Sequence, residues 1–192
     1  MSAERLEPKH TCHLLFDFLV GHAAKDPQRY APVLANAAKL LAAARATGAM
    51  VAYARADHRP DGGTTARTLH DSGPRPPLIT SGTPEAEIVP ELASRPGDYM
   101  VPKHRWSAFH GTYLDLALRA RGVDTILLCG GSTEIGISST AYAARDLDYN
   151  LVIVSDACTT AKQEVHAQLM REVFPRLARV RTTIQVVEML KP

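Results

Sequence analysis

The chain has 192 residues, enough for one α/β domain with a full hydrophobic core. Hydrophobic residues make up 45% of it and charged residues 22%, which are ordinary proportions for a globular protein. The formal net charge is only +2 and the basic residues are scattered, so neither nucleic acid nor an anionic membrane is an expected partner.

Short apolar runs alternate with helical stretches, a pattern typical of a mainly parallel sheet covered by helices on both faces. In chain order, the expected strands are residues 12–18, 49–55, 98–101, 125–129, 151–155 and 182–187. The expected helices are residues 32–47, 84–92, 112–121, 133–147 and 162–174. We therefore predict an α/β fold: one domain, residues 1–192, with a doubly wound sheet of about six mainly parallel strands.

Residues 57–83 form a long polar segment rich in proline, glycine and serine. We expect a loop, and loops of this length usually act as lids, act as binding loops or are mobile. The sequence leaves these roles open, together with a contribution to a neighbouring subunit's pocket.

Several chemically useful residues are expected where strands end. Asp17 ends the first apolar run, Arg55 the second, and Lys103 follows the third, while the glycine-rich segment 130–136 follows the fourth. Ligands of such sheets bind at the carboxyl ends of the strands. The four positions therefore predict a functional rim, with the side chains of Asp17 and Lys103 in contact.

Two stretches carry a resemblance to a known family. Residues 101–112 read Val-Pro-Lys-His-Arg-Trp-Ser-Ala-Phe-His-Gly-Thr, and residues 126–140 read Ile-Leu-Leu-Cys-Gly-Gly-Ser-Thr-Glu-Ile-Gly-Ile-Ser-Ser-Thr. They resemble the isochorismatase-like hydrolases, also called the cysteine hydrolase superfamily, with a Lys before Ser-Ala-Phe and a strand leading into Gly-x-x-Thr-x-x-Cys-Val-x-x-Thr. The resemblance covers residues 12–187 and implies a six-stranded parallel sheet. The position of the family's nucleophilic cysteine is held by Gly136.

The resemblance implies catalytic roles for Asp17 and Lys103. A buried carboxyl can donate or accept a proton, and an adjacent ammonium can stabilise its anion or a substrate carboxylate. Taken alone, Asp17 could equally be a helix cap or a solvated strand end, and Lys103 a surface lysine. Arg105 is a candidate for binding an anionic substrate group, while Trp106 and Phe109 are expected either in the pocket wall or in the core.

The strand-to-helix turn is the third candidate element. Glycine at residues 130 and 131 permits unusual torsions and a close approach to a ligand, although a plain tight turn would use the same residues. The resemblance implies a non-proline cis peptide at the bond before Ser132. Ser132, Thr133 and Glu134 are the expected substrate-binding residues here, and Glu134 either orients water or simply favours the start of the helix.

The glycine at position 136 directs the expected reaction. In the family, members with cysteine hydrolyse amides and related C–N bonds through a thioester, whereas members with glycine include isochorismatases, which cleave a vinyl ether by acid catalysis. We therefore expect a hydrolase of a small anionic metabolite that uses Asp17 and Lys103 without a cysteine. Candidates to bind substrate carboxylates are Arg55, Arg59, Arg67 and Arg105. An amidase-type hydrolase using water, and a catalytically silent ligand-binding member, remain alternatives.

The cysteines and histidines show no pattern of a disulfide framework, an activated thiol or a metal site. Cys12, Cys129 and Cys158 form no paired framework, and the last two lack the helix-start setting that activates a thiol. The eight histidines are dispersed, so we expect no metal and no cofactor. The first 13 residues lack a signal peptide's apolar core, which favours a reducing cytoplasmic setting. The resemblance implies a homodimer or higher homo-oligomer.

Overall fold

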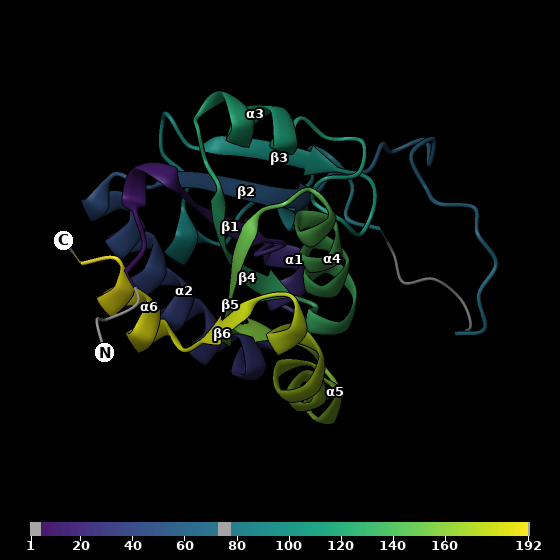
Figure 1. The fold of residues 1–192 in the computed structure, drawn as a ribbon. Helices are drawn as coiled ribbons and strands as arrows, with labels where there is room; N and C mark the ends of the chain where they lie inside the picture. The colour runs from purple at the N-terminus through teal and green to yellow at the C-terminus, as the bar shows by residue number, and fades with distance from the viewer. Residues whose placement is uncertain (1–4, 73–77, 192) are drawn as a thin grey trace.

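The computed structural model describes residues 5–72 and 78–191. These residues form a six-stranded sheet in which every adjacent pair of strands is parallel. In spatial order the strands are β3 (Tyr99–Lys103), β2 (Met50–Ala56), β1 (Thr11–Phe16), β4 (Thr125–Gly131), β5 (Asn150–Thr159) and β6 (Arg179–Arg181). This confirms the predicted α/β fold, as Figure 1 shows.

The helices begin and end where local chemistry allows. They are α1 (Val20–Ala23), α2 (Pro27–Thr47), α3 (Leu114–Ala120), α4 (Ser138–Asp146), α5 (Gln163–Gln168) and α6 (Thr183–Met189), with 3-10 turns at Pro8–His10, Pro84–Ala86, Pro90–Leu92 and Phe174–Arg176 and π-helical turns at Thr133–Ile137 and Leu169–Val173. Helix α2 starts five residues before the predicted position because the Asp26 carboxylate caps it, accepting from the backbone N–H of Arg29 at 3.1 Å. Gly48, with φ of 76°, ends it as predicted.

Two predicted elements were wrong. Residues 84–92 form two short 3-10 turns instead of one helix, because Pro90 cannot donate the hydrogen bond that a continuous helix needs there. Residues 182–187 were predicted as the last strand, but the last strand is β6 and these residues start α6. The Thr182 hydroxyl accepts from the Gln185 backbone, and the Gln185 side chain accepts from the Thr182 N–H. This capping box outweighs the alternating apolar pattern.

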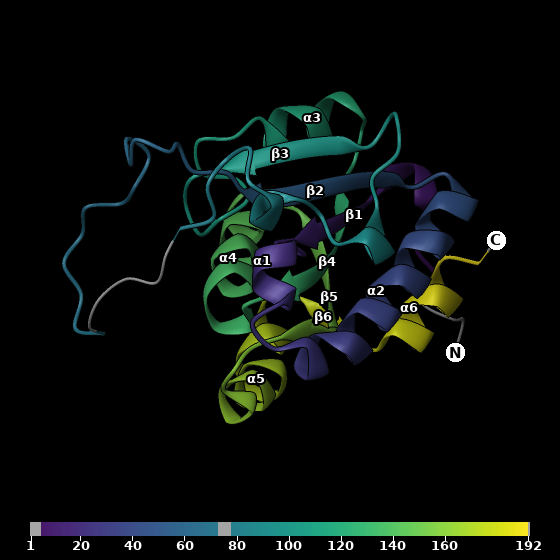
Figure 2. The same ribbon diagram turned by 180° about the vertical axis from the view of Figure 1, so that it is seen from behind.

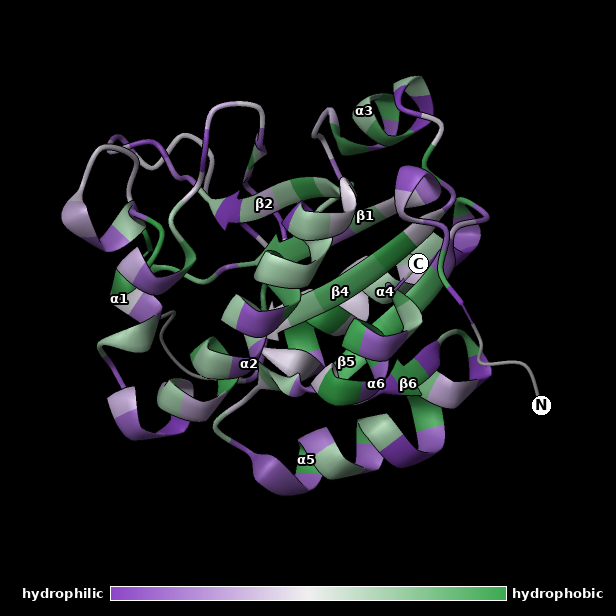
Figure 3. Cartoon of the chain, turned by 90° about the vertical axis from the view of Figure 1, so that its left-hand side faces the viewer, coloured by the Kyte–Doolittle hydropathy of each residue, from purple (hydrophilic) through white to green (hydrophobic). Residues whose placement is uncertain are grey.

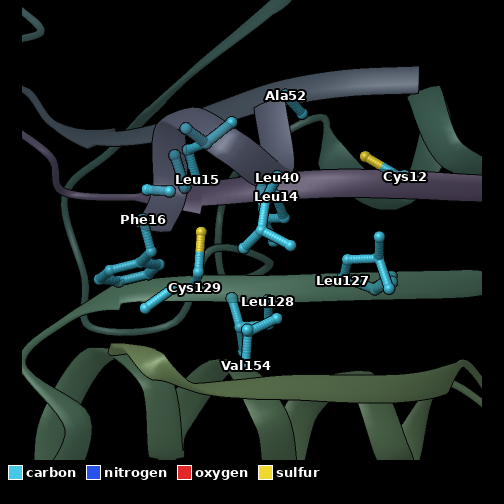
Figure 4. Close-up of a cluster of buried hydrophobic side chains, with 14 of the residues drawn as sticks. Cys12, Leu14, Leu15, Phe16, Leu40, Ala52, Leu127, Leu128, Cys129 and Val154 are labelled. Carbon is cyan, nitrogen blue, oxygen red and sulfur yellow. The ribbon is translucent and has the colours of Figure 1, made fainter. Parts of the chain in front are cut away.

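The core lies on both faces of the sheet. Helices α2 and α6 contact each other on one side of it and α4 lies on the other, as the opposite views of Figures 1 and 2 show. All six residues of β1 are buried, as expected for a central strand covered on both faces. Figure 3 shows apolar strands beneath helices with polar outer surfaces, and Figure 4 shows the packed leucines around the central strands.

Strand order fixes where a ligand can bind. The chain runs outward from β1 through β2 to β3, then returns to β4 on the other side of β1. The carboxyl ends of β1 and β4 therefore flank the point where the winding direction reverses, which is the usual binding position in such sheets. None of the helices in the described ranges is long and apolar enough to cross a membrane.

Candidate active site

Asp17 follows β1 directly and lies at this switch point. Its φ of 52° is in the left-handed region, which Asp tolerates better than most residues. The residue is 7% exposed. Its backbone N–H donates to the carbonyl of Ala54 at 2.9 Å, and its Oδ1 accepts from the backbone N–H of Ala56 at 2.7 Å. The first hydrogen bond to the end of β2 thus holds the Asp17 backbone, and the second holds its carboxylate.

Lys103 brings a buried cation to the same carboxylate. It is the last residue of β3, two residues beyond the predicted strand end, and its side chain is 5% exposed. Its Nζ donates to Oδ2 of Asp17 at 2.7 Å. Both side chains cross the end of β2 to meet, as their positions at strand ends predicted. Removing either partner would leave an unpaired buried charge, which destabilises a fold by about 3–5 kcal/mol.

The turn after β4 packs tightly against the end of β1. Gly130 has φ of 134°, and a Cβ there would lie 2.0 Å from the Phe16 carbonyl oxygen, so only glycine fits. The Gly131–Ser132 peptide bond is cis, as the family resemblance implied. Because β4 lies beside β1, Ser132 and Thr133, which follow β4 directly, lie at the carboxyl end of the sheet next to β1.

Position 136 has no side chain, and a neighbour fills the space. Gly136 is buried in the π-helical turn that precedes α4. A Cβ built on it would lie 2.2 Å from Cε1 and 2.6 Å from Cζ of Phe16, whose side chain is 1% exposed. The same ring lies beneath Lys103, with 4.3 Å from Nζ to the ring centroid. Phe16 thus joins Gly136 to the Asp17–Lys103 pair.

A second polar group flanks the turn. Thr133 is fully buried, and its Oγ1 lies 3.0 Å from Nδ1 of His166 on α5. Oε2 of Glu134 is buried and has no hydrogen-bond partner among the described residues. Burial lowers the pKa of His166, and the charge of Glu134 opposes this shift. Burial raises the pKa of Tyr30, to which the charges of Asp17 and Glu134 also contribute, so Tyr30 lies within electrostatic reach of both carboxylates.

The opposite side of the rim is cationic. The rings of His58 and His104 have centroids 5.9 Å apart. Arg105 is exposed and donates to the carbonyl oxygens of Thr64 at 2.8 Å and His104 at 2.7 Å. Burial lowers the pKa of His58, and the positive charges of His104, Lys103 and Arg105 lower it further, against an opposing effect of Asp17. Burial and these neighbouring cations thus favour the neutral form of His58.

The other sequence candidates lie elsewhere or are already engaged. Arg55 pairs with Asp57 at 3.5 Å. Arg59 pairs with Asp61 at 2.6 Å. Trp106 is not a core residue, because its side chain lies at the surface with 69% exposure. Phe109 stacks on Tyr149, with ring centroids 5.8 Å apart. Tyr149 precedes β5, so this ring contact is at the amino end of the strands, away from the Asp17–Lys103 pair.

The loop between β2 and β3 is described in part. The predicted range 57–83 includes residues 73–77, which lie outside the described residues. In Figures 1 and 2 the stretch that leads up to residue 72 extends away from the sheet, whereas Thr80 returns to it and pairs with His58. The base of the loop carries His58, which touches the rim, and Thr64, which hydrogen-bonds to both His58 and Arg105.

The cysteines are buried and unpaired. Cys129 lies inside β4, as predicted, but Cys158 lies inside β5 instead of after it, because that strand continues to Thr159. Burial raises the pKa of all three thiols, to about 12 for Cys158. Across the described residues, no three His, Cys, Asp or Glu side chains are grouped to hold a metal ion.

Four residues of this site were missed in the sequence. Phe16 precedes Asp17 and reads only as an apolar strand residue, and His58 is one of the eight dispersed histidines. Tyr30 and His166 are brought to the rim by helices α2 and α5, and neither carries a local sequence signal. All four depend on contacts between residues far apart in the chain.

The comparisons with known proteins agree with this architecture. A family model described as the isochorismatase domain matches residues 11–185. The chain belongs to the isochorismatase family and is a hydrolase of that family. A solved isochorismatase family protein from Burkholderia thailandensis is 34% identical, with a TM-score of 0.91 over 100% of both chains.

Curated relatives extend the comparison. The chain is 36% identical to the isochorismatase family protein YecD of Escherichia coli O157:H7 over 96% of this chain and 98% of YecD. It is 48% identical to the family protein YwoC of Bacillus subtilis over 55% of this chain and 56% of YwoC. Ureidoacrylate amidohydrolase RutB of Rhizobium rhizogenes is 36% identical over 65% of this chain and 56% of RutB. The matched regions thus cover little more than half of YwoC and RutB.

A further solved structure has a named reaction. N-carbamoylsarcosine amidase from Thermoplasma acidophilum is 25% identical over 90% of this chain and 96% of its own, with a TM-score of 0.74. The relatives therefore include amidohydrolases as well as proteins named only by family.

Proposed function

We propose that this chain hydrolyses a small anionic metabolite by acid–base catalysis with Asp17 and Lys103, in the manner of a vinyl-ether hydrolase. It would then belong to the subgroup of the family with glycine at the nucleophile position. One observation carries the proposal: a buried carboxylate–ammonium pair with 2.7 Å between Oδ2 and Nζ lies at the switch point, next to a residue 136 that has no side chain.

The protonation state of Asp17 suggests how substrate triggers the chemistry. In the free protein both carboxylate oxygens accept hydrogen bonds, from Lys103 and from the Ala56 backbone, which is the geometry of the anion. An anionic substrate group that binds Lys103 would compete with Asp17 for the positive charge of the ammonium. The Asp17 anion would then be less stabilised, and the protonated acid would be favoured. The acid then protonates the enol carbon, water captures the oxocarbenium ion, and the water's proton returns to Asp17. The hemiketal formed in this way collapses: its C–O bond to the leaving group breaks, its hydroxyl proton passes to the leaving oxygen, and a carbonyl compound and an alcohol are released.

Charge at the rim supports an anionic substrate. Lys103 and Arg105 supply the permanent positive charges on this side, and with His104 they act on His58 and lower its pKa further than burial alone. The nearest loop acids are already paired with arginines, Asp57 with Arg55 and Asp61 with Arg59. Ser132, Thr133 and Glu134 then face the substrate from the other side of the rim. Arg105 is the leading candidate for a carboxylate, since it lies nearest to Lys103 in the chain.

Amide hydrolysis is the second candidate. RutB and N-carbamoylsarcosine amidase are named for C–N bond hydrolysis. The buried Oε2 of Glu134, which has no partner among the described residues, favours a role for this carboxylate in orienting water. A silent ligand-binding member would have no need for the Asp17–Lys103 contact, which therefore favours an enzyme.

The same proposal includes the setting of the enzyme. We place it in the cytoplasm as a single domain acting as a homodimer or higher homo-oligomer, without cofactor, metal or nucleic acid. Three unpaired cysteines fit a reducing compartment. Large apolar side chains at the surface, such as Leu116 at 71% and Ile184 at 80% exposure, fit subunit contacts. Light scattering at micromolar concentration tests assembly, and a monomer would contradict it.

A substrate panel tests the reaction. Purified protein would be assayed against enol-ether carboxylic acids, N-carbamoyl amino acids and simple amides, with and without prior treatment with a thiol alkylator. We expect turnover of an anionic vinyl ether that survives alkylation. Turnover restricted to C–N substrates would replace the first candidate by the second, and loss of turnover on alkylation of the folded protein would contradict both.

A further inference from the structure

We propose that Phe16 and Gly136 form a matched pair in which the Phe16 ring takes the space of a side chain at position 136 and positions the Lys103 ammonium against Asp17. Phe16 is therefore a positioning residue, and the site is committed to chemistry without a covalent bond to residue 136. The catalytic part of this inference rests on the proposed function, but the packing part does not.

The collision is too severe for small adjustments. A Cβ at position 136 would lie 2.2 Å, 2.6 Å and 3.1 Å from Cε1, Cζ and Cδ1 of Phe16. Carbon atoms in contact lie about 3.5–4.0 Å apart, so even alanine needs the ring to move by more than 1 Å. Cysteine, with its additional sulfur, needs the ring to leave.

The ring is held from three sides. Its side chain is 1% exposed, so the surrounding residues cover it almost completely. The Phe16 backbone is fixed by β1 pairing and by Gly130, whose own missing Cβ would collide with the Phe16 carbonyl oxygen and with its Cβ at 2.9 Å. The Lys103 ammonium covers one face of the ring at 4.3 Å. A displaced ring would therefore disturb Lys103.

The contact with Lys103 gives the ring its role. A buried ammonium has lost its water, and an aromatic face provides negative charge density that compensates for this loss. Asp17 accounts for one of the three donors on Nζ. The ring restricts Nζ to the side facing Asp17. Replacing it with an aliphatic side chain removes this restraint while leaving both charged groups in place.

A double-mutant cycle in thermal unfolding tests the packing. Gly136→Ala should lower Tm by about 4–10 °C because it overpacks the ring. Phe16→Leu, which removes Cε1 and Cζ, should restore most of this loss when combined with Gly136→Ala, even though it lowers Tm on its own. Gly63→Ala is the glycine control, at a surface position where the nearest atoms to the added Cβ belong only to the flexible Asp61 and Arg59 side chains. Additive losses, or a Gly136→Ala variant as stable as wild type, would overturn the proposal.

Thiol labelling provides an independent test. Because the native cysteines are buried and their pKa values are raised, folded wild-type protein should react very slowly with iodoacetamide. Phe16→Leu/Gly136→Cys should gain one labelled cysteine, at position 136, with a thiolate favoured by Lys103. Gly136→Cys alone should fold less well or hide its thiol. Equal stability and equal labelling of the single and double variants would show that the ring does not occupy this space.

Kinetics separate positioning from stability. On whichever substrate the panel identifies, Phe16→Leu should lower kcat about 10-fold or more and change KM little, because Lys103 loses its orientation. Phe174→Leu, an equally buried phenylalanine outside the site, should leave kcat unchanged. Unchanged kcat in Phe16→Leu would overturn the positioning role. If no substrate is found, the unfolding and labelling results still decide the matched pair.

Discussion

Strand β1 contributes to two buried polar pairs that behave very differently. In the middle of the sheet, Nε2 of His13 lies 3.2 Å from Sγ of Cys129. At the end of the strand, four residues later, Asp17 meets Lys103 at 2.7 Å. The first pair is neutral, since burial lowers the pKa of His13 to about 3 and raises that of Cys129 far above its ordinary value. The second has the geometry of an ion pair.

The difference lies in the backbone. Inside a sheet, neighbouring strands use the backbone N–H groups, so a charge there would find no donors. Where β2 ends, the N–H of Ala56 is free to donate to Asp17. The mid-strand pair even leaves Nδ1 of His13 without a partner in the described part of the chain. Strand ends can therefore hold a charge, whereas strand centres favour neutral, inert groups.

The largest expected effect is the loss of catalysis in Asp17→Asn. Asparagine keeps the size of the side chain but cannot exchange the proton, so kcat should fall by ~10²–10⁴-fold, as for a lost general acid or base. Asp124→Asn, at the amino end of β4, is the matched control and should keep full activity. An active Asp17→Asn enzyme would remove the functional contrast between the two pairs.

The next effect is on stability. Lys103→Met leaves a buried carboxylate without its cation, so the free energy of unfolding should fall by about 3–5 kcal/mol in urea titrations. Adding Asp17→Asn removes the leftover charge and should restore most of that loss without restoring activity. A double variant no more stable than Lys103→Met alone would show that the pair is not held as an ion pair.

The His13–Cys129 pair should make the stability of the folded protein sensitive to acid and should have no role in catalysis. The pKa of His13 is about 3 in the folded protein and 6.5 as its ordinary value, so only the unfolded chain binds this proton between those values. The titration of His13 therefore adds no pH dependence of stability well above pH 6.5, and stability falls by up to ~1.4 kcal/mol per pH unit as pH decreases from there toward 3. His13→Gln should reduce this slope, and His110→Gln, at an exposed position, should not. Equal slopes in wild type and His13→Gln would contradict the assignment.

The smallest effect is expected for the thiols. Replacing Cys129 and Cys158 together with Ala should leave turnover within about twofold, apart from lost packing, because both thiols are buried and protonated. Circular dichroism would confirm that the variant is folded. Loss of turnover in a folded double variant would mean that a thiol takes part in the reaction. The His13–Cys129 pair could then no longer be described as inert beside a catalytic Asp17–Lys103 pair.

The sequence by itself determined the sheet, because buried parallel strands must be apolar throughout and must alternate with helices. It also placed Asp17, Lys103 and the glycine turn at strand ends, where parallel strands converge. It misjudged residues 182–187, because Thr-Ile-Gln-Val-Val alternates like a strand while the capping box that starts α6 is a local signal of equal length.

Only the tertiary structure decided what surrounds the pair. That the Phe16 ring fills the space beside Gly136 depends on β1, β4 and the π-helical turn being brought together, and the two residues are 120 positions apart in the chain. Likewise, His166 reaches Thr133 from α5, and His58 reaches His104 across the rim. Such contacts depend on volumes and directions in three dimensions. The spacing of residues along the chain contains no information about these volumes and directions. It predicts only which side chains lie on the same face of a helix or strand.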